Sequence, residues 1–446
     1  REQTLNQILV EMDGFDRDDT QIVIGASVTG DTPVLVKKDG GYKLQTIAEI
    51  IDPYYQEGEE NIEKSAQGLQ ALGFQGEKHT GGRSIFRNSA FQYVRSVFRH
   101  TVNEIYEIEY IGGKAKTTGN HSVFVREKGG VRPKFVSELR IGDVLVNLPY
   151  KTQQQNIRAQ QENNQEFELE LPLWAPLFEQ FAPVQEAYEY ALSHTGEISQ
   201  TQLGKQLGFS QRTIGKWQQG ICGPRVLSRN YYQDQITLPE KVKATPALMR
   251  LFGYYTAEGY ARKEIDFCFH EKEKEYIEDV KSLMRTIFNL EPQAERHQTH
   301  DAVNLVYQCK PVANFFIHHC GKGAKNKHIP EFLFGAPKGY FIEFLKGYAA
   351  GDGHLDERGK LELTSVSKQL LIQLNWLARM HGHKGYLGSF VAKKGRRIRG
   401  GNPLPETKAY RLGFGKTQNP LNPLGGKANT KRAIIQSIKR IPYNGY

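Results

Sequence analysis

ASVTGDTPVL (residues 26–35) separates two different sequence patterns in this 446-residue chain. Before it, apolar residues at helical spacing in residues 5–12 predict a helix, and the run of residues 21–24 predicts a buried strand. After Ser27 the pattern changes to short alternating strands separated by glycine turns. The sequence therefore predicts that one protein is interrupted after Ala26 and that a different one begins at Ser27.

The charge of the chain favours a polyanionic partner. Lysine and arginine total 59 against 49 acidic residues, a net charge of +10. Such an excess indicates nucleic acid before a membrane surface, although a basic protein with no such partner fits the net charge equally well. The length allows two to four domains, each with its own core.

The four cysteines and the hydropathy indicate a reducing compartment. No cysteine belongs to a CxxC pair, and the cluster of residues 318–320 (His-His-Cys) lacks residues that would complete a tetrahedral zinc site. We expect reduced thiols, a cytoplasmic location and no membrane segment in this chain. Because it opens on Arg-Glu-Gln without a methionine or signal peptide, we expect a fragment.

Residues 27–150 predict a compact all-β domain. A short helix is expected at residues 46–51, and the polar, glycine-rich residues 54–88 predict a loop insertion. Strands are expected at residues 33–36, 94–99, 104–110, 114–118 and 122–125, with a hairpin at Gly112-Gly113 and a closing segment at 139–146.

Three blocks of this domain resemble the Hint (hedgehog/intein) splicing domain: SVTGDTPVLV from Ser27, the TGNH block from Thr118 to His121, and ELRIGDVLV (138–146). The resemblance implies an autocatalytic N–O acyl shift, in which Ser27 Oγ attacks the carbonyl carbon of Ala26 without a cofactor. His121 would give a proton to the departing nitrogen, and Thr118 would steady the imidazole or the oxyanion. Most inteins begin with cysteine, and a serine is a weaker nucleophile at neutral pH.

Residues 1–26, REQTLNQILVEMDGFDRDDTQIVIGA, resemble the AAA+ ATPase module of FtsH-type zinc metalloproteases. The resemblance implies that they are a fragment of the host protein that the intein interrupts. The P-loop, the HExxH motif and the membrane anchors of that family are absent from this sequence, so neither ATPase nor protease activity is expected.

The middle of the chain predicts a linker and a DNA-reading module. Residues 151–172 are rich in Gln and Asn and predict a polar linker, and residues 173–228 predict a helical region. Residues 200–219 predict a helix-turn-helix, with Gly208 at the bend and Ser210 capping the second helix. A purely structural helical hairpin is the alternative. The polar side chains expected to project outward toward bases and phosphates are Gln211, Arg212, Lys216 and Gln218.

An internal repeat follows, in which LFGYYTAEG (251–259) aligns with LKGYAAGDG (345–353). Small residues four apart predict close contact between two helices, which would bring Glu258 and Asp352 together (352 − 258 = 94 residues apart). Two close carboxylates repel unless a cation lies between them, so we expect Mg²⁺ there. Packing helices with incidental acids are the alternative. The strands and helices expected after the two copies are 265–269 and 274–288, then 361–366 and 368–381.

These repeats resemble the paired motifs of LAGLIDADG homing endonucleases. The resemblance implies that residues 240–420 are an α+β, pseudo-two-fold nuclease that cuts double-stranded DNA at the host-gene insertion site with Mg²⁺. Lys327, in the block KHIP, would lie beside the scissile phosphate, and its second-half counterpart would be Lys427 or Lys431. Strands near 385–392 and 410–414 would saddle the DNA. The basic residues expected to contact phosphates, unless they form only a disordered charged loop, are Lys393, Lys394, Arg396, Arg397 and Arg399.

Residues 430–446 look like the start of a C-terminal splicing region whose His-Asn pair and downstream nucleophile are missing. The sequence thus predicts a multidomain chain: an all-β Hint domain, a small helix-turn-helix module and an α+β endonuclease, in a truncated or split intein with a separate C-terminal fragment as partner. Two alternatives stay open. One is a non-catalytic DNA-binding module with a decayed endonuclease, and the other is a fragment of an ATP-dependent zinc metalloprotease.

Overall fold

The computed structural model describes residues 22–25, 28–78, 84–111, 113–127, 130–146, 167–224, 226, 238–297, 301–392, 406–422 and 433–445. The chain divides into unit 1, made of Arg1–Arg158 and Asn429–Tyr446, and unit 2, made of Ala159–Ala428. No helix of the described ranges is long and apolar enough to cross a membrane. Predicted features that lie outside these ranges are the helix of residues 5–12, the junction residues Ala26 and Ser27, the tract Lys393, Lys394, Arg396, Arg397 and Arg399, and the candidate lysines Lys427 and Lys431.

The first sheet of unit 1 is organised on the long strand β6 (Ser84–Phe98). Its strand order is β1-β6-β5-β2-β3, and β4 also pairs with β6. Val36, Val94 and Val97 belong to the apolar core that this sheet covers. The other strands are β1 (Ile22–Gly25), β2 (Pro33–Lys38), β3 (Gly41–Thr46), β4 (Glu63–Ser65) and β5 (Leu69–Lys78).

The prediction of a loop insertion at residues 54–88 is wrong. This segment contains β4, β5 and the first residues of β6, and β5 and β6 pair as an antiparallel hairpin from Gln70–Tyr93 to Lys78–Ser84. Glycines and polar residues interrupt the alternation of apolar and polar residues that would indicate a strand. The segment is extended because its backbone pairs with neighbouring strands, although its local strand propensity is weak. The short helix is confirmed as α2 (Ile47–Ile51), which Thr46 and Glu49 close with a capping box.

The second sheet of unit 1 has the order β10-β9-β11-β22-β7-β8. The predicted strands and the hairpin between β7 and β8 are confirmed, with Tyr110 opposite Gly113. Ile108, Val125 and Ile435 are buried in its core. Its strands are β7 (Val102–Tyr110), β8 (Gly113–Thr117), β9 (Ser122–Glu127), β10 (Gly130–Phe135), β11 (Val144–Leu145) and β22 (Ala433–Gly445).

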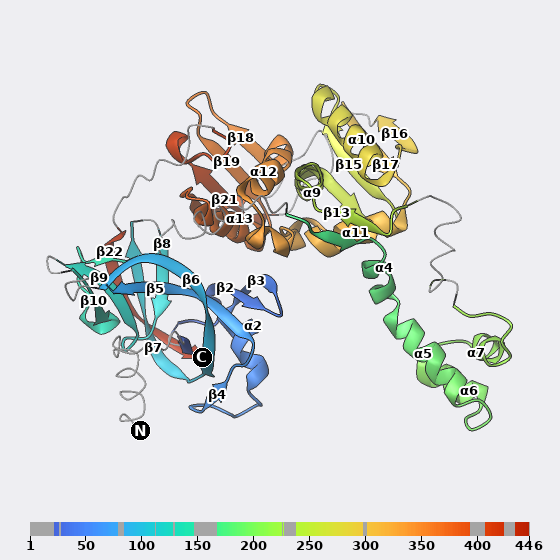
Figure 1. The fold of residues 1–446 in the computed structure, drawn as a ribbon, viewed down its shortest axis with the longest axis horizontal. Coiled ribbons are helices and arrows are strands. Elements are labelled where there is room, and N and C mark those ends of the chain that lie inside the picture. Colours follow the sequence, from blue (N-terminus) through green and yellow to red (C-terminus); the bar gives the residue numbers. More distant parts are fainter. Residues whose placement is uncertain are drawn as a thin grey trace. The chain divides into compact units, whose positions relative to one another are not determined.

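The C-terminal segment returns to unit 1 as its longest strand in this sheet. β22 pairs antiparallel with β7, and its first residues pair with β11, where Val144 lies opposite Ile434. Figure 1 shows β22, in red, beside β7 within this unit. β22 therefore belongs to the sheet that the strands of residues 102–145 form, and unit 2 lies between them in the sequence.

Unit 2 contains the two predicted αβ repeats. The first has helix α9 (Pro246–Glu258) and the sheet β14-β15-β17-β16, and the second has helix α12 (Lys338–Asp352) and the sheet β18-β19-β21-β20. The two sheets share one topology, as the repeat predicts, and α9 lies against α12 (Figure 1). The remaining elements are β14 (Gly259–Ala261), β15 (Ile265–His270), α10 (Lys274–Phe288), β16 (Ala294–His297), β17 (Ala302–Tyr307), β18 (Gly353–Leu355), β19 (Leu361–Ser365), α13 (Lys368–Met380), β20 (Tyr386–Ala392) and β21 (Thr407–Phe414).

The repeats differ after their last strand. The first continues into α11 (Lys310–Cys320), whose buried face includes Phe315 and Phe316. Among the described residues of the second repeat, the short turn η6 (Lys416–Gln418) stands in this place instead. The loop after α11 carries Lys327, so the described part of unit 2 is asymmetric at that position.

The helical region predicted after residue 173 is present but is broken at Phe181. Pro183 lies in the first turn of a new helix, where its missing N–H costs nothing, so two helices replace one. Glu170–Pro172, inside the expected polar linker, instead forms strand β12 and pairs with β13 (Lys241–Lys243). The four helices are α4 (Ala175–Gln180), α5 (Ala182–Ser193), α6 (Gln200–Leu207) and α7 (Gln211–Gln218).

Candidate functional site

The contact between α9 and α12 depends on two glycines. A Cβ placed on Gly253 would lie 2.1 Å from the carbonyl oxygen of Phe344, and one on Gly347 would lie 2.1 Å from the carbonyl oxygen of Arg250. Any side chain at either position would therefore force the two backbones apart. The small-residue spacing predicted this close approach, and the structure confirms it.

The same contact brings the two acids of the repeat together. A Cβ on Gly351, next to Asp352, would lie 2.5 Å from Cγ of Glu258, so the Glu258 side chain lies directly against the end of α12. Each helix ends at the glycine after its acid, where Gly259 and Gly353 turn to extended backbone. The juxtaposition of Glu258 and Asp352 follows from this geometry.

The electrostatics of the pair favour one proton or one cation. Burial, followed by the negative charge of Glu258, raises the pKa of Asp352 to about 7, against the opposing effects of the Tyr348 hydroxyl and the Lys327 charge. At neutral pH Asp352 therefore lies at the boundary between its acid and its carboxylate form. A divalent cation bound between the acids would replace that proton.

Lys327 lies at the end of α9. Its Nζ donates to the carbonyl oxygens of Gly259, at 2.9 Å, and of Tyr255, and it lies 3.3 Å from the centre of the Tyr255 ring. The side chain is buried, and burial lowers its pKa to about 7 in spite of the opposing influence of Cys320 and Asp352. Lys327 thus holds the carbonyl groups at the end of the helix that presents Glu258.

The donor set fits a magnesium ion better than zinc. Glu258 and Asp352 offer hard carboxylate oxygens, and Mg²⁺ commonly takes one or two carboxylates and completes its octahedron with water and substrate phosphates. The described residues contain no group of three or more His, Cys, Asp or Glu side chains placed to hold a metal, and this includes the cluster at 318–320. Within those ranges none of the four cysteines, Cys222, Cys268, Cys309 and Cys320, forms a disulfide.

Sequence reasoning missed Tyr348, which supports the acid pair. Its fully buried hydroxyl donates to the carbonyl oxygen of Thr364 at 3.0 Å and is in hydrogen-bonding contact with the Asp352 and Ser365 side chains. Burial and the Asp352 charge raise the Tyr348 pKa well above its usual value, so it stays a neutral hydroxyl. The repeat could have identified Tyr348, because this residue aligns with Tyr254 of the first copy. The Tyr254 hydroxyl also donates to an acid, Asp279, at 3.0 Å.

In unit 1 the TGNH block lies beside the residues that follow the predicted junction. Val28 forms an isolated antiparallel bridge with Thr117, and the Thr29 N–H donates to the carbonyl oxygen of Lys116 at 3.4 Å. Thr118, the next residue, is buried, and its Oγ1 donates to Asn120 Oδ1 at 2.6 Å. The structure therefore brings the start of the first block and the TGNH block together.

His121 is held by backbone hydrogen bonds on both sides. Its N–H donates to the carbonyl oxygen of Thr118 at 3.3 Å, and its own carbonyl oxygen accepts from the Val136 N–H at 2.9 Å. Burial lowers the pKa of the His121 imidazole to about 4. The ring is therefore neutral at pH 7 and carries one donor nitrogen and one acceptor nitrogen.

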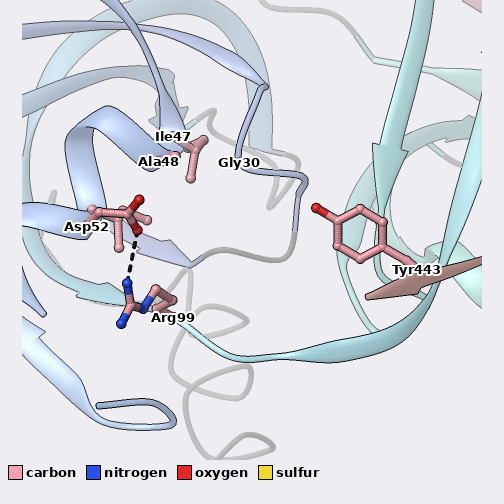
Figure 2. A pocket seen from close by; sticks show the side chains of 7 residues that line it. Gly30, Ile47, Ala48, Asp52, Arg99 and Tyr443 are labelled. Atoms are coloured by element: carbon pink, nitrogen blue, oxygen red, sulfur yellow. Dashed lines mark hydrogen bonds and ion pairs between the residues drawn. The ribbon is translucent and has the colours of Figure 1, made fainter. Parts of the chain in front are cut away.

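A cavity of about 200 Å³ lies next to Gly30 in unit 1. Figure 2 shows Arg99 paired with Asp52, at 3.2 Å, on one side and the Tyr443 hydroxyl turned toward the cavity from β22. The Arg99 guanidinium also donates to the carbonyl oxygens of Gln56 and Glu59. The Arg99 charge is paired inside the fold. The described residues that line the cavity include no Ser, Thr, Cys, His or Lys, and its lining is completed by Ile47, Ala48 and Ile51.

The turn between helices α6 and α7 packs closely against α6. A Cβ on Gly204 would lie 2.6 Å from the carbonyl oxygen of Phe209, and Ser210 caps α7 by accepting from the Thr213 N–H. Gln211 and Arg212 are exposed, and Lys216 is half-buried. The expectation for Gln218 is wrong: its Nε2 donates to the carbonyl oxygen of Ala191 at 2.9 Å, so it faces α5. Its position two turns along the helix puts it on the packed side.

Comparison with models of protein families finds no match. Among curated proteins, the chain is 24% identical to the replication factor C small subunit of Methanocaldococcus jannaschii, over 91% of this chain and 19% of that protein. It is 35% identical to the transcription initiation factor IIB of the same organism, over 27% of this chain and 18% of that protein. The chain thus spans about a fifth of the length of these two relatives.

Two kinds of solved structure are each similar to a part of the chain. A crystal structure of the transcription factor IIB Mvu mini-intein is 28% identical with a TM-score of 0.23, and it covers 27% of this chain and 68% of that chain. Mesophilic variants of the homing endonuclease I-DmoI are 13% identical with a TM-score of 0.28, over 38% of this chain and 89% of that chain.

Proposed function

We propose that this chain is an intein-type insert whose unit 2 is a Mg²⁺-dependent, site-specific DNA endonuclease. The observation that carries the proposal is the glycine-mediated contact of α9 and α12, which places Glu258 against the end of the helix that presents Asp352. Two like αβ repeats present these acids at equivalent positions. A pair of acids on a pseudo-two-fold axis suits a substrate that has two strands of opposite direction.

The residues would divide the work of phosphodiester hydrolysis between them. Glu258 and Asp352 would hold Mg²⁺, which supplies an activated water and stabilises the leaving oxygen. Tyr348 keeps the Asp352 carboxyl in place, and Lys327 fixes the end of α9. We further propose that Lys327, whose pKa lies near neutrality, acts beside the scissile phosphate, and that Gln211, Arg212 and Lys216 contact the DNA outside the cut site.

Substitution of the acids tests the nuclease. With a plasmid that carries the uninterrupted host sequence, we expect wild type to cut in Mg²⁺ and Glu258→Gln and Asp352→Asn to lose cutting while still binding. Glu278→Gln, an exposed acid that pairs with Lys281 on α10, is the matched control and should cut normally. Cutting by both site variants would refute the proposed metal site, and binding without cutting by wild type would favour the non-catalytic DNA-binding module.

A second activity, self-cleavage at Ala26–Ser27, is favoured by a different observation. The Val28–Thr117 bridge holds the residue after Ser27 beside the block that contains Thr118 and His121. Because His121 is neutral at pH 7, it is suited to take the Ser27 Oγ proton and pass it to the Ala26–Ser27 nitrogen as that bond breaks. The N–C bond breaks, an ester O–C bond forms, and the proton ends on the Ser27 amine.

Hydroxylamine tests this shift, because it cleaves an ester faster than an amide. Intact-mass measurement should show release of residues 1–26 from wild type, no release from Ser27→Ala, and slower release from His121→Ala. Ser137→Ala, close to Gly119 on the same surface, serves as the control. Unchanged release in Ser27→Ala would refute Ser27 as the nucleophile.

The similarity to otherwise unrelated proteins supports the idea of an insert. The chain matches minor parts of a replication factor C subunit and of a transcription initiation factor, which have no common function in their names. A segment shared by such proteins behaves as a separate passenger. We propose that the host here is an FtsH-like protein and that a C-terminal fragment completes splicing. Nucleotide binding by this chain would instead favour the ATPase-protease alternative.

A further inference from the structure

The polypeptide before the proposed junction is part of the first sheet of unit 1. β1 (Ile22–Gly25) pairs parallel with the last residues of β6, in a register that places Val23 opposite Ser96, Ile24 opposite Val97 and Gly25 opposite Phe98. The sequence analysis assigned these residues to the interrupted host. The structure nevertheless incorporates them into the sheet of the inserted unit.

The edge of β6 that receives β1 would be costly to leave open. On its other edge, the same residues pair with β4, where Ser65 lies opposite Ser96 and Glu63 opposite Phe98. Val94, Ser96 and Val97 have exposed fractions of 3%, 3% and 0%, whereas Arg95 is exposed, so three of the five side chains in this part of β6 are buried and Phe98 is half-buried. Without β1, backbone N–H and C=O groups of an interior strand would have no ladder partner on one side.

The junction is bracketed by backbone pairing. Upstream, Gly25 pairs with Phe98, and downstream, Val28 pairs with Thr117. Ala26 and Ser27 are the two residues between these anchor points. The downstream anchor is next to the TGNH block, because Thr117 is the residue that precedes Thr118.

We propose that the edge of β6 over Val94–Phe98 is a docking strand for an extended host segment that enters the junction. Backbone hydrogen bonds provide the recognition, as in other cases of strand addition to a sheet edge, so the site selects an extended conformation rather than particular side chains. β-branched residues such as Ile22, Val23 and Ile24 favour that conformation. This inference rests on the proposed self-cleavage for its biological meaning, but the docking itself can be measured separately.

A disulfide trap in the full chain tests the docking. Paired residues of adjacent strands have Cα atoms about 4.8 Å apart, within the range that a disulfide spans. Every variant carries Cys222→Ser, which removes the exposed thiol. The variant Val23→Cys/Ser96→Cys should form its disulfide completely. Under the same conditions the control Val23→Cys/Val97→Cys, which is one residue out of register, should stay reduced. Equal oxidation of the two pairs, or none in the first, would overturn the docking register.

Rates of hydroxylamine release test its backbone character. Replacement of Ile22, Val23 and Ile24 together by alanine should leave the rate near that of wild type. Proline lacks the backbone N–H, and in an edge strand only alternate residues direct this group toward the neighbouring strand. Of Val23→Pro and Ile24→Pro, the variant that removes an N–H bonded to β6 should therefore slow release by about fivefold, the effect of one lost backbone hydrogen bond. The other variant should release at the wild-type rate. Loss of release in the alanine variant, or equal rates in both proline variants, would contradict a backbone-only site.

The two measurements separate this inference from the proposed function. Trapping in register without any hydroxylamine release from wild type would support the docking strand and remove the self-cleavage. Hydroxylamine release from wild type without in-register trapping would support the self-cleavage and refute the docking strand. If both hold, the released segment should stay attached to the trapped protein until the disulfide is reduced.

Discussion

At the scale of single residues, the half-buried Asp352 and His121 have pKa values displaced from their usual range, and each sits where the proposed chemistry needs it. Burial raises the pKa of Asp352 to about 7 and lowers that of His121 to about 4. A bound cation would stabilise the carboxylate form of Asp352, and the neutral ring of His121 suits it to the proposed proton transfer. Perturbed groups of this kind gather at functional sites, although structural networks also produce them.

Asp352 should couple magnesium binding and stability to pH. Its pKa in the folded protein lies above the unfolded value of 3.8, so the folded state binds an extra proton between these two values and loses stability as the pH rises through about 7. Asp352→Asn should therefore be more stable than wild type at pH 8, with the difference shrinking toward pH 5. Urea unfolding at the two pH values measures this.

The same proton should compete with Mg²⁺. Below pH 7 the apparent Mg²⁺ affinity of wild type should weaken by about tenfold per pH unit, because each bound ion must displace the proton. Isothermal titration between pH 5.5 and 7.5 checks this, with Glu258→Gln as a variant expected to bind weakly throughout. An affinity independent of pH would contradict the role of Asp352.

His121 should destabilise unit 1 in acid. Its folded pKa of about 4 lies below the unfolded value of 6.5, so the stability it contributes is present above pH 6.5 and is lost as the pH falls through about 4. His121→Gln should not show this part of the acid loss. Unfolding free energies from pH 7 to 4, with the imidazole resonance followed by NMR, measure it, and a titration near 6.5 in the folded protein would contradict it.

At the scale of helices and strands, local pattern predicted well where the local signal and the tertiary fold agree. The repeat gave α9, α12 and the strands that follow them, and glycine spacing gave their contact. The hairpin of β5 and β6 was not predicted, because each strand is held by pairing with the other and neither shows the alternation of a strand in its own sequence. Gln218 was misplaced for a similar reason, since the packing of α5 decides which face of α7 is buried.

The glycine contact predicts a sharp difference between two alanine substitutions in α12. Gly347→Ala should lower the unfolding free energy by about 1–3 kcal/mol, because its Cβ would meet the Arg250 carbonyl oxygen at 2.1 Å, and should reduce DNA cutting. Gly339→Ala is the matched control on the same helix. It is exposed with nothing within 4 Å, so it should be neutral or stabilising by about 0.5–1 kcal/mol. Equal effects would argue against a tight crossing.

At the scale of the molecule, one unit is inserted into another. The sequence predicts the start of a C-terminal splicing region at residues 430–446, and in the structure β22 pairs with β7 and β11 in the second sheet of unit 1. Which strands it pairs with could not be predicted, because partners more than 300 residues apart leave no local pattern. The last described strand before unit 2 in the sequence, β11, and the first described strand after it, β22, pair with each other.

Removal of unit 2 should therefore spare unit 1. A protein in which a short Gly/Ser linker replaces residues 159–428 should keep its β-sheet circular dichroism and its hydroxylamine release at Ala26–Ser27. DNA cutting should be lost completely. Collapse of the shortened protein, while wild type folds, would contradict the insertion described above.

The account rests on an insert that recognises the gene it interrupts, and one DNA assay tests this most directly. Two plasmids are compared, one with the host sequence joined without the insert and one with the insert's coding sequence at the Ala26–Ser27 codons. In Mg²⁺, wild type should cut the uninterrupted plasmid at the insertion site and leave the interrupted plasmid intact, and Asp352→Asn should cut neither. Equal cutting of both plasmids, or of neither, by wild type would contradict the account.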